Sequence, residues 1–120
     1  MISLEAARKH AAESLDGFPP EVVVAYLAFA EKGSPADLDT VVFGVLRFYL
    51  VKKPAGDLAA MPGSTRLIED LGCDSLTMMD TVFMVESILD LKLDDERLAG
   101  LKTIDDLRNY LRQLTGLAVG

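Results

Sequence analysis

The residues that decide the fold read E-D-L-G-C-D-S-L (Glu69–Leu76), followed at 77–91 by T-M-M-D-T-V-F-M-V-E-S-I-L-D-L. Ser75 stands directly behind Asp74, at the point where a short polar loop becomes a long apolar segment. Asp and Ser both favour the start of a helix, because their side-chain oxygens accept hydrogen bonds from its free N–H groups. If Asp74 caps the helix, the hydroxyl of Ser75 is left free for another use.

The helix predicted from Ser75 to about Asp90 is apolar around much of its circumference. One stripe of a helical wheel is expected to face the core and consists of Met78, Val82, Val85 and Leu89. A second stripe lies beside Asp80 and Glu86 and consists of Leu76, Met79 and Phe83. This second stripe either packs against the N-terminal part of the chain or forms an exposed surface for partners, and the pattern favours neither.

The rest of the chain also reads as helices, with no sustained strand-type alternation. Helices are expected at about residues 4–15, 20–32, 35–51 and 75–90, with a helical turn within 94–101 and a last helix from Thr103. Ser34 is expected to cap the helix that Pro35 begins. Thr103 and Asp106 have the spacing of a capping box. Residues 54–65 have the composition of a loop.

The composition indicates one folded domain. Of its 120 residues, 50% are apolar and 26% are charged, which is enough apolar content for a buried core. The longest run without a charge, Val22–Ala30, is too short to span a bilayer. No secretory signal is recognisable, and a single cysteine allows no internal disulfide, so we expect a cytoplasmic setting.

The charge of the chain is negative and unevenly distributed. A net charge of −7 makes a nucleic acid an unexpected partner, because phosphate binding needs a basic patch. Residues 67–91 contain six acids and no Lys or Arg. Charge clustering alone favours a solvated acidic face, but such a segment also attracts proteins with basic surfaces.

Ser75 lacks the companions of a catalytic serine. The only histidine, His10, lies far away in the sequence, and no G-x-S-x-G turn surrounds Ser75. A serine without its own base makes sense as a substrate hydroxyl that another enzyme modifies. Cys73 is expected to be a packing residue, and the scattered acids lack the spacing of metal ligands.

The run D-L-G-C-D-S-L, the helix after it and the capped segment T-I-D-D-L-R-N-Y-L resemble the acyl carrier proteins over roughly residues 34–112. That family carries a D-S-L signature at the start of its second core helix, and the serine of this signature holds 4′-phosphopantetheine. The resemblance implies that Ser75 carries this cofactor, with Asp74 beside it. The chain departs from the family pattern at Cys73, where a small apolar residue is usual, and at Asp94, where proline is frequent.

The resemblance further implies a carrier that is not an enzyme. It would hold an acyl group as a thioester for enzymes of fatty-acid, polyketide or specialised lipid biosynthesis, acting as a monomer. Its implied partners are a phosphopantetheinyl transferase and acyl-transferring or condensing enzymes with basic docking surfaces. The residues expected to meet them are Leu76, Met79, Asp80, Phe83 and Glu86. The alternatives are an aminoacyl or peptidyl carrier, a helical partner-binding module without a prosthetic group, and, least favoured, a small serine hydrolase.

The expected fold is all-α, a four-helix acyl-carrier-like bundle with an additional N-terminal helical pair. Residues 1–33 would form the extension and residues 34–120 the carrier-like domain. The segment 22–30 is too apolar for a disordered tail. We expect it to dock on the bundle, where Met84 and Ile88 form a further apolar flank of the helix that begins at Ser75.

Overall fold

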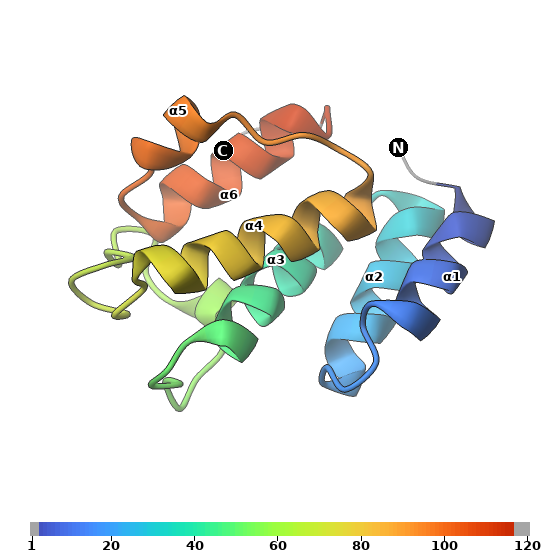
Figure 1. The fold of residues 1–120 in the computed structure, drawn as a ribbon, viewed down its shortest axis with the longest axis horizontal. Helices are drawn as coiled ribbons and strands as arrows, with labels where there is room; N and C mark the ends of the chain where they lie inside the picture. Colours follow the sequence, from blue (N-terminus) through green and yellow to red (C-terminus); the bar gives the residue numbers. More distant parts are fainter. Residues whose placement is uncertain (1–2, 117–120) are drawn as a thin grey trace.

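The computed structural model describes residues 3–116, and this part of the chain is a bundle of helices (Figure 1). Its elements, in chain order, are α1 (Leu4–Glu13), α2 (Pro20–Lys32), α3 (Pro35–Tyr49), the short 3₁₀ helix η1 (Leu58–Ala60), α4 (Ser75–Leu89), α5 (Asp95–Ala99) and α6 (Ile104–Leu114). Within residues 3–116 there is no strand, and only Arg66 and Thr103 form an isolated bridge. The predicted all-α bundle with an extra N-terminal helical pair is therefore confirmed. None of the helices described is long and apolar enough to cross a membrane.

Local sequence signals set most of the helix boundaries. Thr103 and Asp106 form the predicted capping box, each side chain accepting a hydrogen bond from the other's backbone N–H. Gly33 ends α2 with φ of 72°, a left-handed conformation that glycine adopts without steric cost. Ser34 occupies the predicted N-cap position of α3, but its side chain makes no capping hydrogen bond, so Pro35 is the stronger signal for the start of this helix.

Two helices end earlier than the sequence suggested. The expected ends were residues 15 and 51, whereas α1 ends at Glu13 and α3 ends at Tyr49. After Tyr49, Leu50 adopts an extended backbone (φ −63°, ψ 135°) that cannot continue the helix. Leu15 leaves the helix but stays buried, because it turns inward from the loop that follows α1.

α3 lies at the centre of the bundle. α2, α4, η1 and α6 all pack against it. In Figure 1, α4 crosses in front of α3, with α1 and α2 on one side and α5 and α6 on the other. The α3 side chains buried by these neighbours are Leu38, Val41, Val42, Phe43, Val45 and Leu46.

The N-terminal pair is docked on α3 and α4. α2 approaches α3 so closely that a Cβ added at Gly44 would lie 2.5 Å from Cγ2 of Val22. The buried hydroxyl of Tyr26 donates a hydrogen bond to the carbonyl of Ile88, near the C-terminal end of α4. Burial, together with the charge of Asp90, raises the pKa of Tyr26, which keeps the phenol protonated and able to donate. The expected docking of the apolar segment 22–30 is thus present in the structure.

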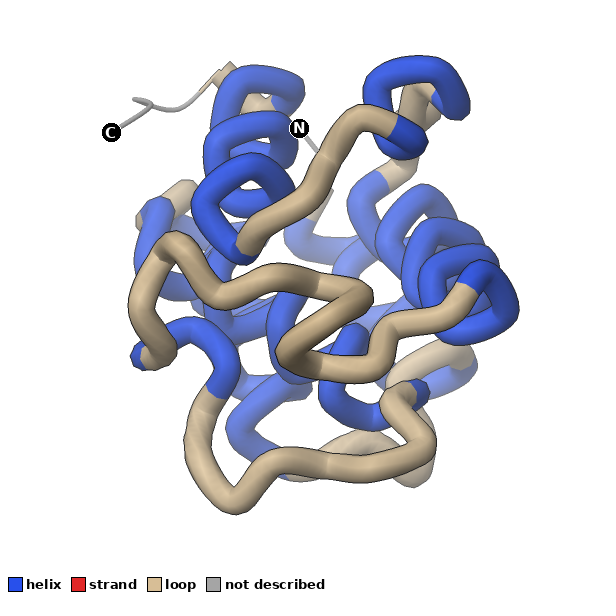
Figure 2. Tube along the Cα trace, turned by 90° about the vertical axis from the view of Figure 1, so that its left-hand side faces the viewer, coloured by secondary structure: helices blue, strands red, loops and turns tan. Residues whose placement is uncertain are grey.

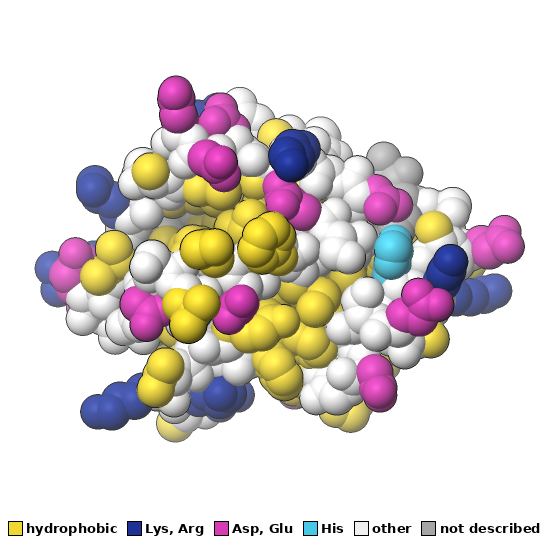
Figure 3. Space-filling view, viewed as in Figure 1, with side chains coloured by type: hydrophobic (Ala, Val, Ile, Leu, Met, Phe, Trp, Pro, Cys, Tyr) yellow, Lys and Arg dark blue, Asp and Glu magenta, His cyan; other side chains and the backbone are white. Residues whose placement is uncertain are grey.

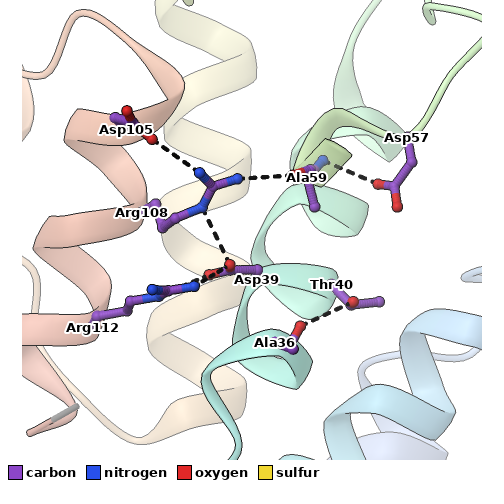
Figure 4. Close-up of polar contacts among 8 residues, drawn as sticks. All are labelled: Ala36, Asp39, Thr40, Asp57, Ala59, Asp105, Arg108 and Arg112. Atoms are coloured by element: carbon purple, nitrogen blue, oxygen red, sulfur yellow. Dashed lines mark hydrogen bonds and ion pairs between the residues drawn. The ribbon is translucent and has the colours of Figure 1, made fainter. Parts of the chain in front are cut away.

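A partly buried cluster of charges joins α6 to α3 (Figure 4). Asp39 of α3 accepts hydrogen bonds from Nε and Nη2 of Arg112, and its carboxylate lies 3.2 Å from Nε of Arg108. Arg108 also reaches the carbonyl of Ala59 at 2.8 Å and the carboxylate of Asp105 at 2.9 Å. One aspartate therefore neutralises two arginines that the packing of α6 removes from water.

Candidate functional site

A tightly bonded loop fixes the start of α4. The N–H of Leu67 donates to the carbonyl of Lys102 at 2.8 Å, and the N–H of Cys73 donates to the carbonyl of Leu67 at 2.9 Å. Gly72 turns the chain with φ of 70° immediately before Cys73. Figure 2 looks onto this end of the molecule, where the loops run between the helix ends. The loop is thereby attached to the start of α6, and it delivers Asp74 to the N-cap position of α4.

Asp74 is the cap that the sequence suggested. Its carboxylate accepts a hydrogen bond of 2.8 Å from the backbone N–H of Thr77. Hydrogen bonds from Thr77 lower the pKa of Asp74, because they stabilise the charged form of the carboxylate. The next residue, Ser75, is the exposed first residue of α4. Among the hydrogen bonds within residues 3–116, none uses the hydroxyl of Ser75.

The only histidine of the chain does not accompany Ser75. His10 lies 3.6 Å from Asp90, just beyond the opposite end of α4. α4 has 15 residues and therefore spans about 21 Å, so this length of helix separates His10 from Ser75. Cys73 is 2% exposed, and burial raises the pKa of its thiol to about 11, so it is the packing residue that we expected. Among the described residues there is also no cluster of side chains that could hold a metal ion.

An apolar groove of about 560 Å³ begins beside Ser75 and runs between α4 and α5. Glu86, Lys92 and Asp95 lie among its lining residues and make part of its lining polar. The apolar side chains that line it are Met78, Met79, Val82, Phe83, Leu93, Leu98 and Ala99. An exposed hydroxyl thus lies at one end of an apolar depression.

The structure corrects the predicted core stripe of α4. Val85 and Leu89 are buried as expected, but Met78 and Val82 are only half-buried and line the groove. The buried positions in the first two turns of α4 are instead occupied by Thr77 and Thr81. The sequence analysis missed these threonines because a hydroxyl usually disfavours burial; here each hydroxyl donates to a backbone carbonyl, that of Tyr49 or of Thr77.

The second stripe of α4 is exposed. Leu76, Met79 and Phe83 keep 66%, 55% and 64% of their surface in contact with solvent. The choice left open by the sequence is therefore settled: these side chains do not pack against the N-terminal pair. Figure 3 shows the apolar surface along α4 with acidic side chains beside it.

The two acids beside this stripe differ in their surroundings. Asp80 and Glu86 are both half-buried rather than freely solvated. Glu86 accepts a hydrogen bond of 2.8 Å from the N–H of Leu93 and so ties the segment before α5 to α4. No local pattern indicated this bond, because it joins a helix to an irregular segment seven residues away.

Comparison with known proteins identifies the class of protein that these features define. A family model described as "Phosphopantetheine attachment site" matches residues 56–111. The acyl carrier protein of Thermotoga maritima is 31% identical over 75 residues, which cover 62% of this chain and 93% of that protein. The acyl carrier protein of Campylobacter concisus is 32% identical over 73 residues, or 61% of this chain and 95% of that protein. No solved structure matches.

The chain belongs to the acyl carrier protein family. It is therefore a carrier and not an enzyme, and the cofactor of this carrier is covalently attached 4′-phosphopantetheine. The start of α4 fits such a group. It offers a free hydroxyl, N–H groups of a first helical turn that favour a phosphodiester, and an apolar groove beside them.

Proposed function

We propose that Ser75 is the residue that holds the 4′-phosphopantetheine, and that the protein presents an acyl group to enzymes of fatty-acid, polyketide or specialised lipid biosynthesis. The observation that carries the proposal is the exposed hydroxyl of Ser75, which the helix does not need because Asp74 supplies the cap. A relative from Mycobacterium leprae, 38% identical over 47 residues, is named a meromycolate extension acyl carrier protein. Its name supports an acyl cargo; the match covers 39% of this chain and 41% of that protein.

The role of this chain in loading is that of a substrate. The only histidine lies at the other end of α4, so the loading enzyme removes the proton of the Ser75 hydroxyl. The oxygen of Ser75 then forms the phosphoester bond as the pyrophosphate bond of coenzyme A breaks and adenosine 3′,5′-bisphosphate leaves. Asp74 keeps the first turn of α4 in place while Ser75 reacts. The free N–H groups of that turn then stabilise the negative charge of the phosphodiester. When bound, the cofactor supplies the thiol on which an acyl group is carried as a thioester.

The groove between α4 and α5 gives the cargo an apolar surface near its attachment point. Met78 and Val82 line its α4 side, and Leu98 lies on α5. An acyl chain placed there would remove apolar surface from water, at about 25 cal/mol per Å². Glu86 helps to keep the groove in shape, because its bond to Leu93 anchors the segment that leads into α5.

The exposed stripe of α4 is the proposed contact surface for partner enzymes. Leu76, Met79 and Phe83 supply apolar contacts, and Asp80 adds negative charge beside them. Partners with Lys or Arg around an apolar patch would be steered towards this helix. In this proposal residues 34–120 form the carrier domain, and residues 1–33 are an extension that stabilises it.

Intact mass spectrometry tests the attachment site directly. The protein is incubated with coenzyme A and a broad-specificity phosphopantetheinyl transferase, and the mass gain of one phosphopantetheine is expected. Ser75→Ala should abolish the gain, and its circular dichroism should match the wild type because the hydroxyl of Ser75 makes no hydrogen bond within residues 3–116. Modification of the Ala variant at the wild-type rate would refute the assignment.

A further inference from the structure

The N-terminal pair contributes an aromatic side chain to the surface at the C-terminal end of α3. Phe18, in the loop between α1 and α2, stacks on Phe48 of α3 with ring centroids 4.1 Å apart. Tyr49 contacts both rings edge-on, with its ring centroid 5.3 Å from that of Phe48 and 6.1 Å from that of Phe18. Val51 follows and is 84% exposed, while Phe48 is 38% exposed. We call Phe18, Phe48, Tyr49 and Val51 the α3-end surface.

The α3-end surface adjoins the start of α4. The carbonyl of Tyr49 accepts a hydrogen bond of 3.4 Å from the hydroxyl of Thr77, two residues after Ser75. Burial is the main cause that raises the pKa of the Tyr49 hydroxyl, and the negative charge of nearby Asp80 adds to this increase. Val51 and Asp74 line the same depression of about 660 Å³. An enzyme that reaches Ser75 therefore comes close to the part of this surface that Tyr49 and Val51 form.

The position of the surface selects one kind of partner. An enzyme that attaches a group to the Ser75 hydroxyl must bring its active site to that atom, whereas an enzyme that works on the thioester acts at the far end of the arm. Loading therefore requires contact around Ser75 itself. Exposed apolar side chains beside that position favour the loading enzyme as their occupant.

The charges around Ser75 set the chemistry of this partner. The segment 67–91 carries six acids and no basic residue, so basic side chains of the partner must lie opposite α4. The depression beside Val51 is lined by Lys52 and Lys53 but also by Glu69, Asp70 and Asp74, so its charge favours neither sign in the partner. The complementary surface is apolar opposite the α3 end and basic opposite α4.

We propose that the α3-end surface is a second docking contact for the phosphopantetheinyl transferase, next to the exposed stripe of α4. The inference rests on the proposed attachment of the arm at Ser75. It gives the N-terminal pair a part in recognition, through Phe18, in addition to its packing on the bundle. The partner supplies an apolar side chain to this surface and Lys or Arg side chains to α4.

Steady-state loading kinetics test the proposal. The full chain, coenzyme A and a broad-specificity phosphopantetheinyl transferase are used, and the mass gain is followed at varied carrier concentration. Val51→Glu and Phe48→Ser should raise KM for the carrier about fivefold or more and leave kcat within about twofold. The matched control is Val24→Glu, because Val24 is 67% exposed on the face of α2 that turns away from its buried residues.

Each outcome decides the proposal. A raised KM for both surface variants, with Val24→Glu at the wild-type value, supports it. If Phe48→Ser also lowers the melting temperature, the Val51 variant decides, since Val51 is nearly fully exposed. Wild-type kinetics for both surface variants, or an equal effect of Val24→Glu, overturns it. If the wild type is not loaded, or if the Ser75→Ala variant is loaded, the proposed function itself fails. If loading occurs normally at Ser75 and the surface variants have wild-type kinetics, only the proposed second contact is refuted.

Discussion

At the scale of single residues, Asp74 and Ser75 divide two tasks that either of them could perform. Both residue types cap helices, and from the sequence alone either could have been the cap. The structure gives the cap to Asp74, whose carboxylate accepts from the N–H of Thr77. Ser75 thereby keeps its hydroxyl exposed at a fixed position, which is what an enzyme that modifies it requires.

The lowered pKa of Asp74 predicts how the cap responds to acid. Because the pKa is lower in the folded protein than in the unfolded chain, where it is about 4, the charged cap stabilises the fold above that pH. The contribution is lost as the pH falls through the folded pKa. We expect the difference in melting temperature between the wild type and Asp74→Asn to be larger at pH 7 than at about pH 3. Thermal unfolding followed by circular dichroism measures it, and a difference that does not change with pH would contradict the cap's ionic role.

At the scale of elements, the sequence predicted the helices better than the faces that they bury. Proline, glycine and capping residues placed α2, α4 and α6 correctly, because these signals act within a few residues. The buried face of α4 was predicted only in part, since its apolar residues surround most of the helix. Tertiary contacts chose the face: α3 covers Thr77 and Thr81, whose hydroxyls find carbonyl partners, and the groove leaves Met78 half-exposed.

The candidate site was predictable to a similar degree. The D-S-L run identified Asp74 and Ser75, because the cap and the free hydroxyl depend on local sequence. The α3-end surface was not predictable, because Phe18 and Phe48 lie 30 residues apart and meet only when α2 packs on α3. Contacts of this kind leave no short-range pattern in a single sequence.

The charge cluster between α3 and α6 yields a prediction about stability. Asp39 is 12% exposed in its side chain and faces Arg108 and Arg112, which are 15% and 18% exposed. Asp39→Ala would leave two largely buried cations without their shared partner, so we expect the free energy of unfolding to fall by about 3 kcal/mol or more. Urea unfolding measures this loss.

Asp105 provides the matched control for this cluster. It contacts the same Arg108 at 2.9 Å, but its side chain is 55% exposed. Asp105→Ala should change the free energy of unfolding by no more than about 1 kcal/mol, because solvent screens exposed ion pairs. Equal losses for the two variants would show that burial of the cluster is not what makes Asp39 important.

At the scale of the whole molecule, the N-terminal pair completes a core that the other helices leave open. Ile88 of α4 is fully buried, and Tyr26 of α2 bonds to its carbonyl. Val22 of α2 packs against the space left by Gly44 of α3, where any larger residue would collide with it. The pair covers the flank of α4 that faces away from the groove, so it shapes the carrier without blocking Ser75.

This packing predicts slow amide exchange in α2 of the intact protein. The helix buries Val22, Ala25, Tyr26 and Phe29, so its amides should open only when much of the bundle opens. We expect residues 22–30 to exchange as slowly as the buried part of α3, as measured by hydrogen–deuterium exchange with mass spectrometry. α5 is the internal control: it has five residues, none of them buried, and should exchange much faster. If residues 22–30 exchanged as fast as α5, the pair would be a mobile arm, and neither its packing on α4 nor the position of Phe18 at the α3-end surface could persist in solution.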